Sequence, residues 1–235
     1  MNSLSGIYKK LYDRGLYSDE DYIPDEENVA LKFQENGYLL IPKLITDIQN
    51  LYSPPPFDDD GNRKFGTLGY REGQVVYKEE DGQVPTAFSR YGYPPFENIH
   101  DLVRQALENT LGFELFPTYY FERFYWKDSV LKKHVDRPAC EISVTIQISS
   151  NTKPWPIFFK KPNGETTCLI LGDGDGVVYK GMELEHWRDN LDSRFNKIQR
   201  YINKLRKKDD DTYHHQIFFH YVKAQGNYVQ HAFDR

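Results

Sequence analysis

The chain has 235 residues, of which 39% are hydrophobic, 28% charged and 15% aromatic. A chain of this length folds as one large domain or two small ones, and its composition excludes a disordered or fibrous protein. The formal net charge of −5 argues against a general electrostatic grip on nucleic acid. No apolar run approaches the roughly 20 residues that span a bilayer. We therefore expect neither nucleic acid nor a membrane among the partners of this chain.

Cysteine usage bears on the cellular compartment. Only Cys140 and Cys168 are present, too few for a disulfide scaffold or a cysteine-rich zinc site. The N-terminal residues also lack the long apolar stretch of a secretory signal. These features predict a reducing compartment, which is the cytoplasm, or the host cytoplasm if the gene is viral. The sequence leaves the oligomeric state open.

The sequence pattern of residues 1–112 predicts a region of helices and loops that packs on a β-barrel. A helix should begin near Pro24, where acidic residues fill the first turn, and end at Gly37, which suits a left-handed stop. A short buried strand is expected at 38–42. An amphipathic helix is expected at 96–110, because its apolar residues recur at helical spacing.

The segment 53–95 within this region is rich in Pro, Gly, Asp and Tyr. This composition predicts little regular structure beyond a strand at 74–78. Irregular segments of this length in a compact domain are usually functional, so we expect a lid or a substrate loop here.

From residue 113 onward the pattern changes to strands separated by Gly and Pro. Strands at this density are typical of a sandwich or a barrel. We expect 113–235 to form the core of a mainly β fold with flanking helices, one single domain overall. The expected strands are Pro117–Trp126, Val130–Asp136, Ile142–Ser149, Trp155–Lys160, Thr166–Leu171, Gly176–Lys180 and Tyr213–Val222.

A helical insert is expected at 191–208, with an apolar stripe that includes Phe195 and Ile202 and a second face that is basic. The plainer interpretation of the basic face is a solvated surface. The alternative is a docking surface for an acidic partner. A run of charged residues usually forms no more than a solvent-exposed helix face, which favours the first interpretation.

The main chemical feature is His134-Val135-Asp136. On a strand, residues i and i+2 face the same side, with Cα atoms roughly 6.5–7 Å apart, which suits chelation of one metal ion. His186 follows after several more expected strands, and a neighbouring strand could bring it opposite the pair. Two histidines and one carboxylate form the facial triad of non-haem Fe(II) oxygenases. The alternative for so short a motif is a pair of surface residues.

A wider set of motifs surrounds this tripeptide. From about residue 28 to Val222 the chain resembles the Fe(II)/2-oxoglutarate-dependent oxygenases, most closely their prolyl-4-hydroxylase-like branch. The resemblance rests on Phe33–Pro42, Leu131–Ser143, Trp155-Pro156-Ile157, Gly174–Gly181 and Glu185-His186-Trp187-Arg188.

The resemblance implies a double-stranded β-helix, a jelly-roll or cupin-like barrel, with Fe(II) held by His134, Asp136 and His186. It further implies 2-oxoglutarate and O₂ as co-substrates, with ascorbate as an optional reductant. In this family, 2-oxoglutarate is decarboxylated to succinate and CO₂ while a substrate C–H bond is hydroxylated. Relatives act on prolyl or other residues of peptides and proteins, or on small molecules, so the resemblance implies a hydroxylase but does not fix its substrate.

The family also requires a cation for the far carboxylate of 2-oxoglutarate, and here the sequence departs from the usual pattern. The last expected strand carries no Arg, and Lys197 falls in the helical insert. Arg188, which shares a strand face with His186, is the first candidate, followed by Arg123 and then Lys197. By resemblance, Tyr125 on the preceding strand is a candidate hydrogen-bond partner of the same co-substrate; the alternative is a core tyrosine.

Substrate contacts are expected from the aromatic lid segment, with Tyr70, Arg71, Tyr91 and Tyr93 as candidates. Two other functions remain open at this stage. One is a non-catalytic β-helix binding module, which the missing cation on the last strand favours. The other is a cupin-type metalloenzyme that does not use 2-oxoglutarate, although such proteins commonly use more histidine ligands.

The last expected strand is also rich in histidine. His214, His215 and His220 could form a second metal cluster. The favoured interpretation is a strand with one packed and one solvated face, because spacing alone supports the metal.

Overall fold

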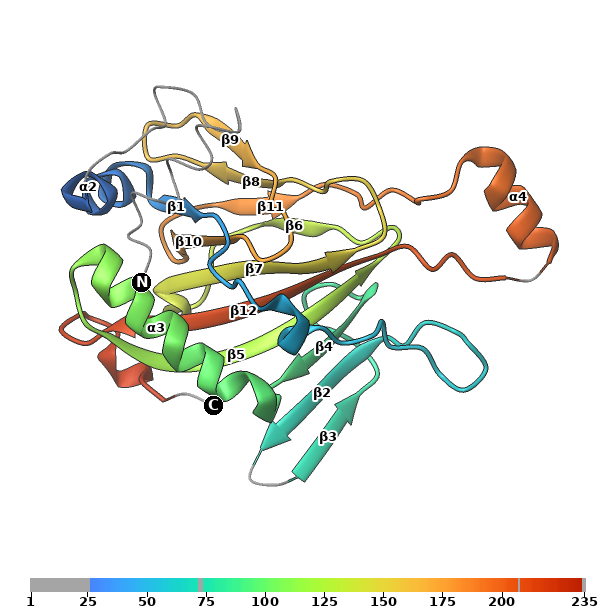
Figure 1. Ribbon diagram of the computed structural model, residues 1–235, viewed down its shortest axis with the longest axis horizontal. Helices are drawn as coiled ribbons and strands as arrows, with labels where there is room; N and C mark the ends of the chain where they lie inside the picture. The colour runs from blue at the N-terminus through green and yellow to red at the C-terminus, as the bar shows by residue number, and fades with distance from the viewer. Residues whose placement is uncertain (1–25, 72–73, 207, 234–235) are drawn as a thin grey trace.

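The computed structural model describes residues 26–71, 74–206 and 208–233, which form two facing β-sheets with helices on one outer side (Figure 1). The larger sheet runs in the order β1 (Tyr38–Ile41), β10 (Gly176–Lys180), β7 (Ile142–Ser150), β12 (Tyr213–Lys223), β5 (Leu115–Trp126), β4 (Ala87–Tyr91), β2 (Gly66–Arg71) and β3 (Gln74–Lys78). The smaller sheet runs in the order β6 (Leu131–His134), β11 (His186–Arg188), β8 (Ile157–Lys160) and β9 (Thr166–Leu169).

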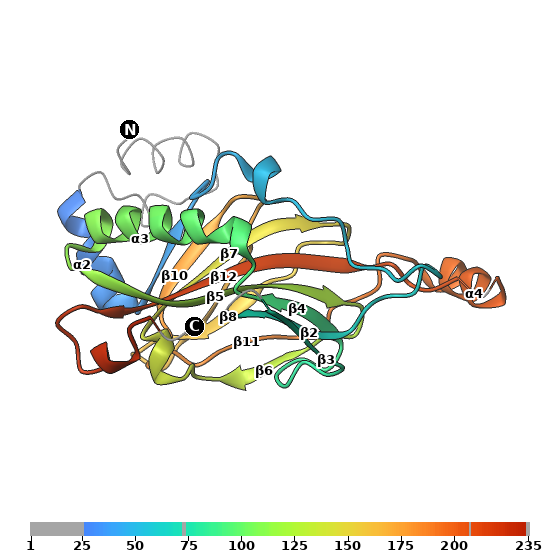
Figure 2. The same cartoon turned by 90° about the horizontal axis from the view of Figure 1, so that it is seen from below.

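The two sheets lie one above the other (Figure 2) and enclose the interior of a barrel. Neighbouring strands are antiparallel, except that β2 and β4 run parallel. This mainly β arrangement is the double-stranded β-helix expected from the sequence, and the seven strands predicted after residue 113 are all present, most with an end shifted by one or two residues.

The expectation of little regular structure in 53–95 is wrong for residues 66–91. Strands β2, β3 and β4 all lie in this segment and extend the larger sheet. Strand β3 confirms the strand expected at 74–78, whereas β2 and β4 were not expected, since β2 contains two glycines and β4 does not alternate between buried and exposed residues. Short 3₁₀ turns precede and follow these strands, at Ile48–Leu51 and Pro94–Phe96.

Two helices, α2 (Glu26–Asn36) and α3 (Glu97–Leu111), cover the outer face of the larger sheet (Figures 1 and 2). The expected start near Pro24 lies outside the described residues. The expected end is confirmed, because Gly37 has φ +76° and its N–H donates to the Phe33 carbonyl at 2.9 Å. Buried Phe33 and Leu107 join the core between helices and sheet.

Strand β12 shows how the barrel divides its side chains. Ile217, Phe219 and Tyr221 belong to the helix-side core, whereas Phe218 and His220 line a cavity inside the barrel. Because successive side chains of a strand point to opposite faces, β12 has one apolar face toward the helices and one face toward the cavity inside the barrel. The interior is where the candidate site lies.

The expected helical insert is shorter than predicted and projects from the barrel. Helix α4 (Lys197–Leu205) lies at the far end of a long excursion between β11 and β12 (Figure 1). Leu191, which we expected to begin the helix, is instead buried at the base of this excursion. In the described part of the chain, no helix is both long and apolar enough to cross a membrane.

Candidate active site

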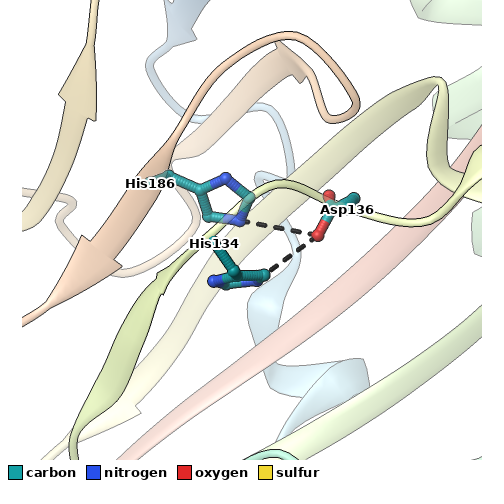
Figure 3. A group of neighbouring side chains, drawn as sticks. All are labelled: His134, Asp136 and His186. Atoms are coloured by element: carbon teal, nitrogen blue, oxygen red, sulfur yellow. Dashed lines mark ion pairs between the residues drawn. The ribbon is translucent and has the colours of Figure 1, made fainter.

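Three side chains predicted as metal ligands converge at one end of the barrel interior. Strands β6 and β11 pair so that His186 lies directly opposite His134. Strand β6 ends at His134, earlier than expected, and the chain then turns so that the Asp136 N–H donates to the Gly181 carbonyl at 2.8 Å. Oδ1 of Asp136 lies 3.5 Å from Nε2 of His134 and 3.6 Å from Nε2 of His186 (Figure 3).

The backbone fixes which nitrogen of each imidazole faces this point. Nδ1 of His134 lies 2.7 Å from the Lys132 carbonyl, and Nδ1 of His186 lies 3.0 Å from the Leu184 carbonyl. A carbonyl only accepts, so each Nδ1 carries the proton and donates it. Each Nε2 then presents a lone pair toward Asp136, which is the tautomer that a metal requires.

The carboxylate of Asp136 is held from behind. Ser143 Oγ donates to Asp136 Oδ2 at 2.8 Å and lies 3.0 Å from Nδ1 of His220. Burial would raise the pKa of Asp136, but its contacts with His134, His186 and His220 and the hydrogen bond from Ser143 lower it. Asp136 is therefore ionised at neutral pH, with Oδ1 directed at the two imidazoles.

A cavity of about 290 Å³ opens beside the three ligands. Its wall carries buried polar atoms that have no hydrogen-bond partner among the described residues: Tyr125 Oη, Thr145 Oγ1, Arg188 Nη2 and His220 Nε2. Such atoms are uncommon in folded proteins because leaving them unpaired costs free energy. Their gathering around one cavity, with Arg188 on the smaller sheet and the other three on the larger, indicates a site for a polar ligand.

Arg188 brings a buried positive charge to the lining of this cavity. Its side chain is 1% exposed, its guanidinium stacks on the Trp155 ring at 4.8 Å, and its Nη1 donates to the Trp155 carbonyl. No carboxylate of the described residues forms an ion pair with it. Burial accordingly lowers the pKa of Arg188 to about 10. A buried, unpaired guanidinium is the group that an anionic ligand would stabilise.

Arg123, the second candidate, is already fully paired. Its Nη2 lies 3.1 and 3.0 Å from the two carboxylate oxygens of Asp81, and its Nε donates to Ser89 at 2.9 Å. Its Nη1 donates to Oε1 of Gln83, whose Nε2 lies 2.9 Å from Nε2 of His134. Arg123 thus holds the segment before β4 against the candidate metal ligands, and each of its three nitrogens already has an acceptor.

The third cation candidate and two of the substrate candidates lie away from the cavity. Lys197 is exposed on α4, far from the barrel (Figure 1). Tyr93 packs against Arg90 and the helix-side core, and Tyr70 contacts Tyr93. Tyr91 does line the cavity. The side chain of Arg71 lies outside the described part of the chain.

The three histidines of β12 do not gather into one cluster. His215 stacks on Phe124 and lies 2.7 Å from the Glu122 carboxylate through Nε2. His220 lies near Asp136 and Cys140, close enough for these three to hold a metal, and thus belongs to the cavity already described. His214 is buried edge-on to Trp155, and neither of its ring nitrogens has a partner in the described structure.

Three residues at the site were missed from the sequence. Gln83 lies in a turn and carries no sequence signal of its contact with His134. Ser143 and Thr145 could have been found, because β7 alternates Ser143, Thr145, Gln147 and Ser149 with Val144, Ile146 and Ile148. That alternation predicts a strand with one polar interior face.

The fold is shared with solved structures of Fe(II)/2-oxoglutarate oxygenases. A 2OG-Fe(II) oxygenase family oxidoreductase from Burkholderia pseudomallei has a TM-score of 0.54 and 13% identity, over 84% of this chain and 91% of that one. A prolyl-4-hydroxylase from Pseudomonas putida has a TM-score of 0.53 and 10% identity, over 83% and 98%.

HygX from Streptomyces hygroscopicus, solved with nickel and 2-oxoglutarate bound, has a TM-score of 0.55 and 12% identity, over 83% of this chain and 85% of that one. No protein-family model and no curated protein matches the chain. The resemblance drawn from the sequence motifs is therefore confirmed at the level of the fold.

Proposed function

We propose that the chain is an Fe(II)- and 2-oxoglutarate-dependent oxygenase that acts as a hydroxylase. The observation that carries the proposal is the convergence of His134, Asp136 and His186 on one point, beside a cavity wall that holds the unpaired cation of Arg188. Neither feature alone defines this chemistry. Together they offer a metal site and an anion site within one cavity.

The three ligand side chains fit Fe(II). Two neutral imidazoles and one carboxylate are the donor set of non-haem Fe(II) oxygenases, and they leave coordination positions open. The hydrogen bonds of both Nδ1 atoms to carbonyls hold His134 and His186 in the required tautomer. When bound, the iron would supply activation of O₂, which the side chains of the protein cannot provide.

The unpartnered donors fit the far carboxylate of 2-oxoglutarate. Arg188 would pair with the carboxylate, and the hydroxyls of Tyr125 and Thr145 line the same cavity and could donate to it or to its neighbouring oxygens. Binding would also relieve the burial of an unpaired charge. We therefore assign co-substrate binding to Arg188 and Tyr125, and we propose for Arg123 a role in holding Gln83 rather than in binding 2-oxoglutarate.

Part of the cavity wall is aromatic and suits a substrate carbon chain. Tyr91 stacks on Phe121 at 4.5 Å between ring centroids, and Tyr119 lies 6.2 Å from Tyr91. Such a wall excludes water from a reactive centre. We propose prolyl or other residues of a peptide as the first substrates to examine. Small molecules come next, because HygX has also been solved with hygromycin B bound.

The direct test is formation of succinate from 2-oxoglutarate by the purified chain with Fe(II) and O₂, measured by proton NMR. We expect slow turnover even without the true substrate, and none in His186→Ala. The matched control is His231→Ala, a histidine that does not line the cavity and should retain turnover. Iron binding without any succinate would instead support the non-catalytic module or the cupin-type enzyme.

A further inference from the structure

A second feature of the molecule is unrelated to the barrel interior. Residues 192–212, which we call the arm, leave the barrel after β11, form α4 and return to β12 (Figures 1 and 2). The base of the arm is firmly attached. Arg63 pairs with Asp209 at 3.1 Å, and the Asn151 side chain donates to the Asp211 carbonyl at 2.8 Å.

The arm concentrates positive charge. Residues 193–208 contain no Asp or Glu, and they include Arg194, Lys197, Arg200, Lys204, Arg206, Lys207 and Lys208. The acidic triplet that follows does not neutralise the helix, because its members bind at the base of the arm: Asp209 to Arg63, Asp210 to Ser193 and Thr212, and Asp211 to Arg194. Among the described residues, Lys197, Arg200 and Lys204 form no ion pair.

The same helix exposes an apolar stripe. Ile198, Tyr201 and Leu205 are 72%, 65% and 67% exposed, Ile202 is also exposed, and α4 buries no residue at all. At about 100° per residue these four side chains occupy one stripe roughly 100° wide, and the three basic side chains of α4 border it on one side.

A helix of this kind needs a surface to cover it. Isolated helices shorter than roughly 12–15 residues are marginal in water, and α4 has nine. Its capping box, formed by Asn196 and Gln199, satisfies the first turn but does not cover the apolar stripe. The helix gains the missing burial only when its stripe meets an apolar surface.

We propose that the arm is a peripheral anchor that lays α4 on an anionic lipid surface. An apolar stripe bordered by cations is the pattern of helices that lie in the membrane interface. The remainder of the chain carries the excess negative charge, so an anionic surface attracts the arm and repels the body. This mode of contact needs no membrane-spanning segment.

The size of the surface favours lipid over a protein partner. A specific protein interface takes roughly 20–30 residues on each side, whereas nine-residue α4 presents four apolar and three basic side chains on a convex tip. A bilayer needs no complementary groove. A phosphate backbone would use the cations but would leave the apolar stripe exposed.

The test is sedimentation of the purified full-length chain with vesicles of phosphatidylcholine alone or with about 30% phosphatidylserine, at salt near 0.1 M. We expect binding to the anionic vesicles only. The variant Lys197→Gln/Arg200→Gln/Lys204→Gln should weaken partitioning by about tenfold or more. A Leu205→Trp variant should show a blue shift of its fluorescence on binding, because the stripe enters the interface.

The matched control is Lys64→Gln/Lys78→Gln/Lys153→Gln, which removes the same charge from exposed lysines outside the arm and should bind as the unmodified chain does. Unchanged melting temperatures check that both variants fold. The proposal is overturned if neither vesicle binds, or if both triple variants bind equally. It is also overturned if light scattering shows a dimer that only the arm variant loses, since the arm would then cover a second copy.

Discussion

Two arginines lie inside the barrel with the same exposure of 1%, yet their surroundings are opposite. Arg123, on β5, donates to Asp81, Ser89 and Gln83 and has no unused nitrogen. Arg188, on β11, donates to one backbone carbonyl and leaves Nη2 unpaired. A buried charge is tolerated when it is paired, so the first arginine completes the fold and the second lacks its counter-ion.

The neighbours of each arginine repeat the contrast. The Asp81, Ser89 and Gln83 side chains that Arg123 contacts are hydrogen-bonded, and the segment that holds Gln83 is fixed in place. Around Arg188 the hydroxyls of Tyr125 and Thr145 and both ring nitrogens of His214 lack partners in the described structure. Both arginines are buried cations, so a cation alone does not mark a binding site. The buried polar atoms without partners are what distinguish the surroundings of Arg188.

The largest effect is expected at the proposed metal site, whose cavity both arginines line. Asp136→Ala removes the carboxylate that both imidazoles face, so it should weaken Fe(II) or Co(II) binding by more than about a hundredfold without unfolding the chain. Metal titration followed by absorbance measures the change. Asp192→Ala, an exposed carboxylate on the arm, is the control and should bind metal normally. Full metal stoichiometry in Asp136→Ala would contradict the assignment of the site.

Removing the paired arginine should damage the fold. Arg123→Met leaves the Asp81 carboxylate buried without its partner, which is expected to lower the free energy of unfolding by about 3–5 kcal/mol. Urea denaturation of the metal-free protein measures it. A stability equal to that of the unmodified chain would show that this pair is dispensable and would remove the contrast between the two arginines.

Removing the unpaired arginine should damage ligand binding instead. Arg188→Met is expected to weaken 2-oxoglutarate binding by about tenfold to a hundredfold, because one charge-assisted contact is lost. The free energy of unfolding without ligand should stay the same or rise, since a buried charge without a carboxylate partner disappears. A large loss of stability would show that Arg188 is structural, like Arg123.

Lowering the pH should reduce the stability that the Asp81–Arg123 pair contributes, by less than the substitutions above. Burial would raise the pKa of Asp81, but Arg123 and the hydrogen bond from Ser89 lower it below its ordinary 3.8. The folded state therefore gains stability from this carboxylate above pH 3.8 and loses it as the pH falls below that value. In Arg123→Met this part of the acid dependence should vanish. Parallel stability profiles of the two proteins between pH 5 and 3 would contradict the pairing.

The smallest effect is expected at Gln83. Its side-chain amide lies 2.9 Å from the His134 nitrogen that a metal would need, so metal and amide compete for one lone pair. Gln83→Ala should tighten metal binding by about two- to tenfold, the worth of one neutral hydrogen bond. Competition between the protein and a coloured chelator measures this. Weaker metal binding in the variant would mean that Gln83 supports the site rather than competing for it.

Much of the fold was predictable because the responsible patterns are local. The strands after residue 113 show β-spacing and Gly or Pro boundaries, and Gly37 ends α2 as expected. Within 53–95 only β3 was predicted; β2 contains two glycines and β4 shows no alternation of buried and exposed residues, so neither gave a strand signal. Helix α4 was predicted too long because Leu191 is buried at the base of the arm rather than on a helix.

The candidate site was predictable as a set of residue types but not as a set of contacts. The sequence indicated His134, Asp136 and His186, and pairing of β6 with β11 brings the histidines together. It also placed Arg188 and Arg123 among the candidates. No feature of the sequence indicated that Arg123 forms an ion pair with Asp81 while Arg188 forms none among the described residues. The partners Asp81 and Gln83 come from a turn whose position depends on the whole sheet.

The central claim is that the anion site formed by Arg188 adjoins the metal site. Anaerobic titration of the Fe(II)-loaded protein with 2-oxoglutarate tests it, because the family resemblance implies a weak visible charge-transfer band when the co-substrate chelates the iron. We predict that the band forms in the unmodified chain and that Arg188→Met requires at least about ten times more 2-oxoglutarate to reach it. Saturation of both proteins at the same concentration, or no band in either, would contradict the account.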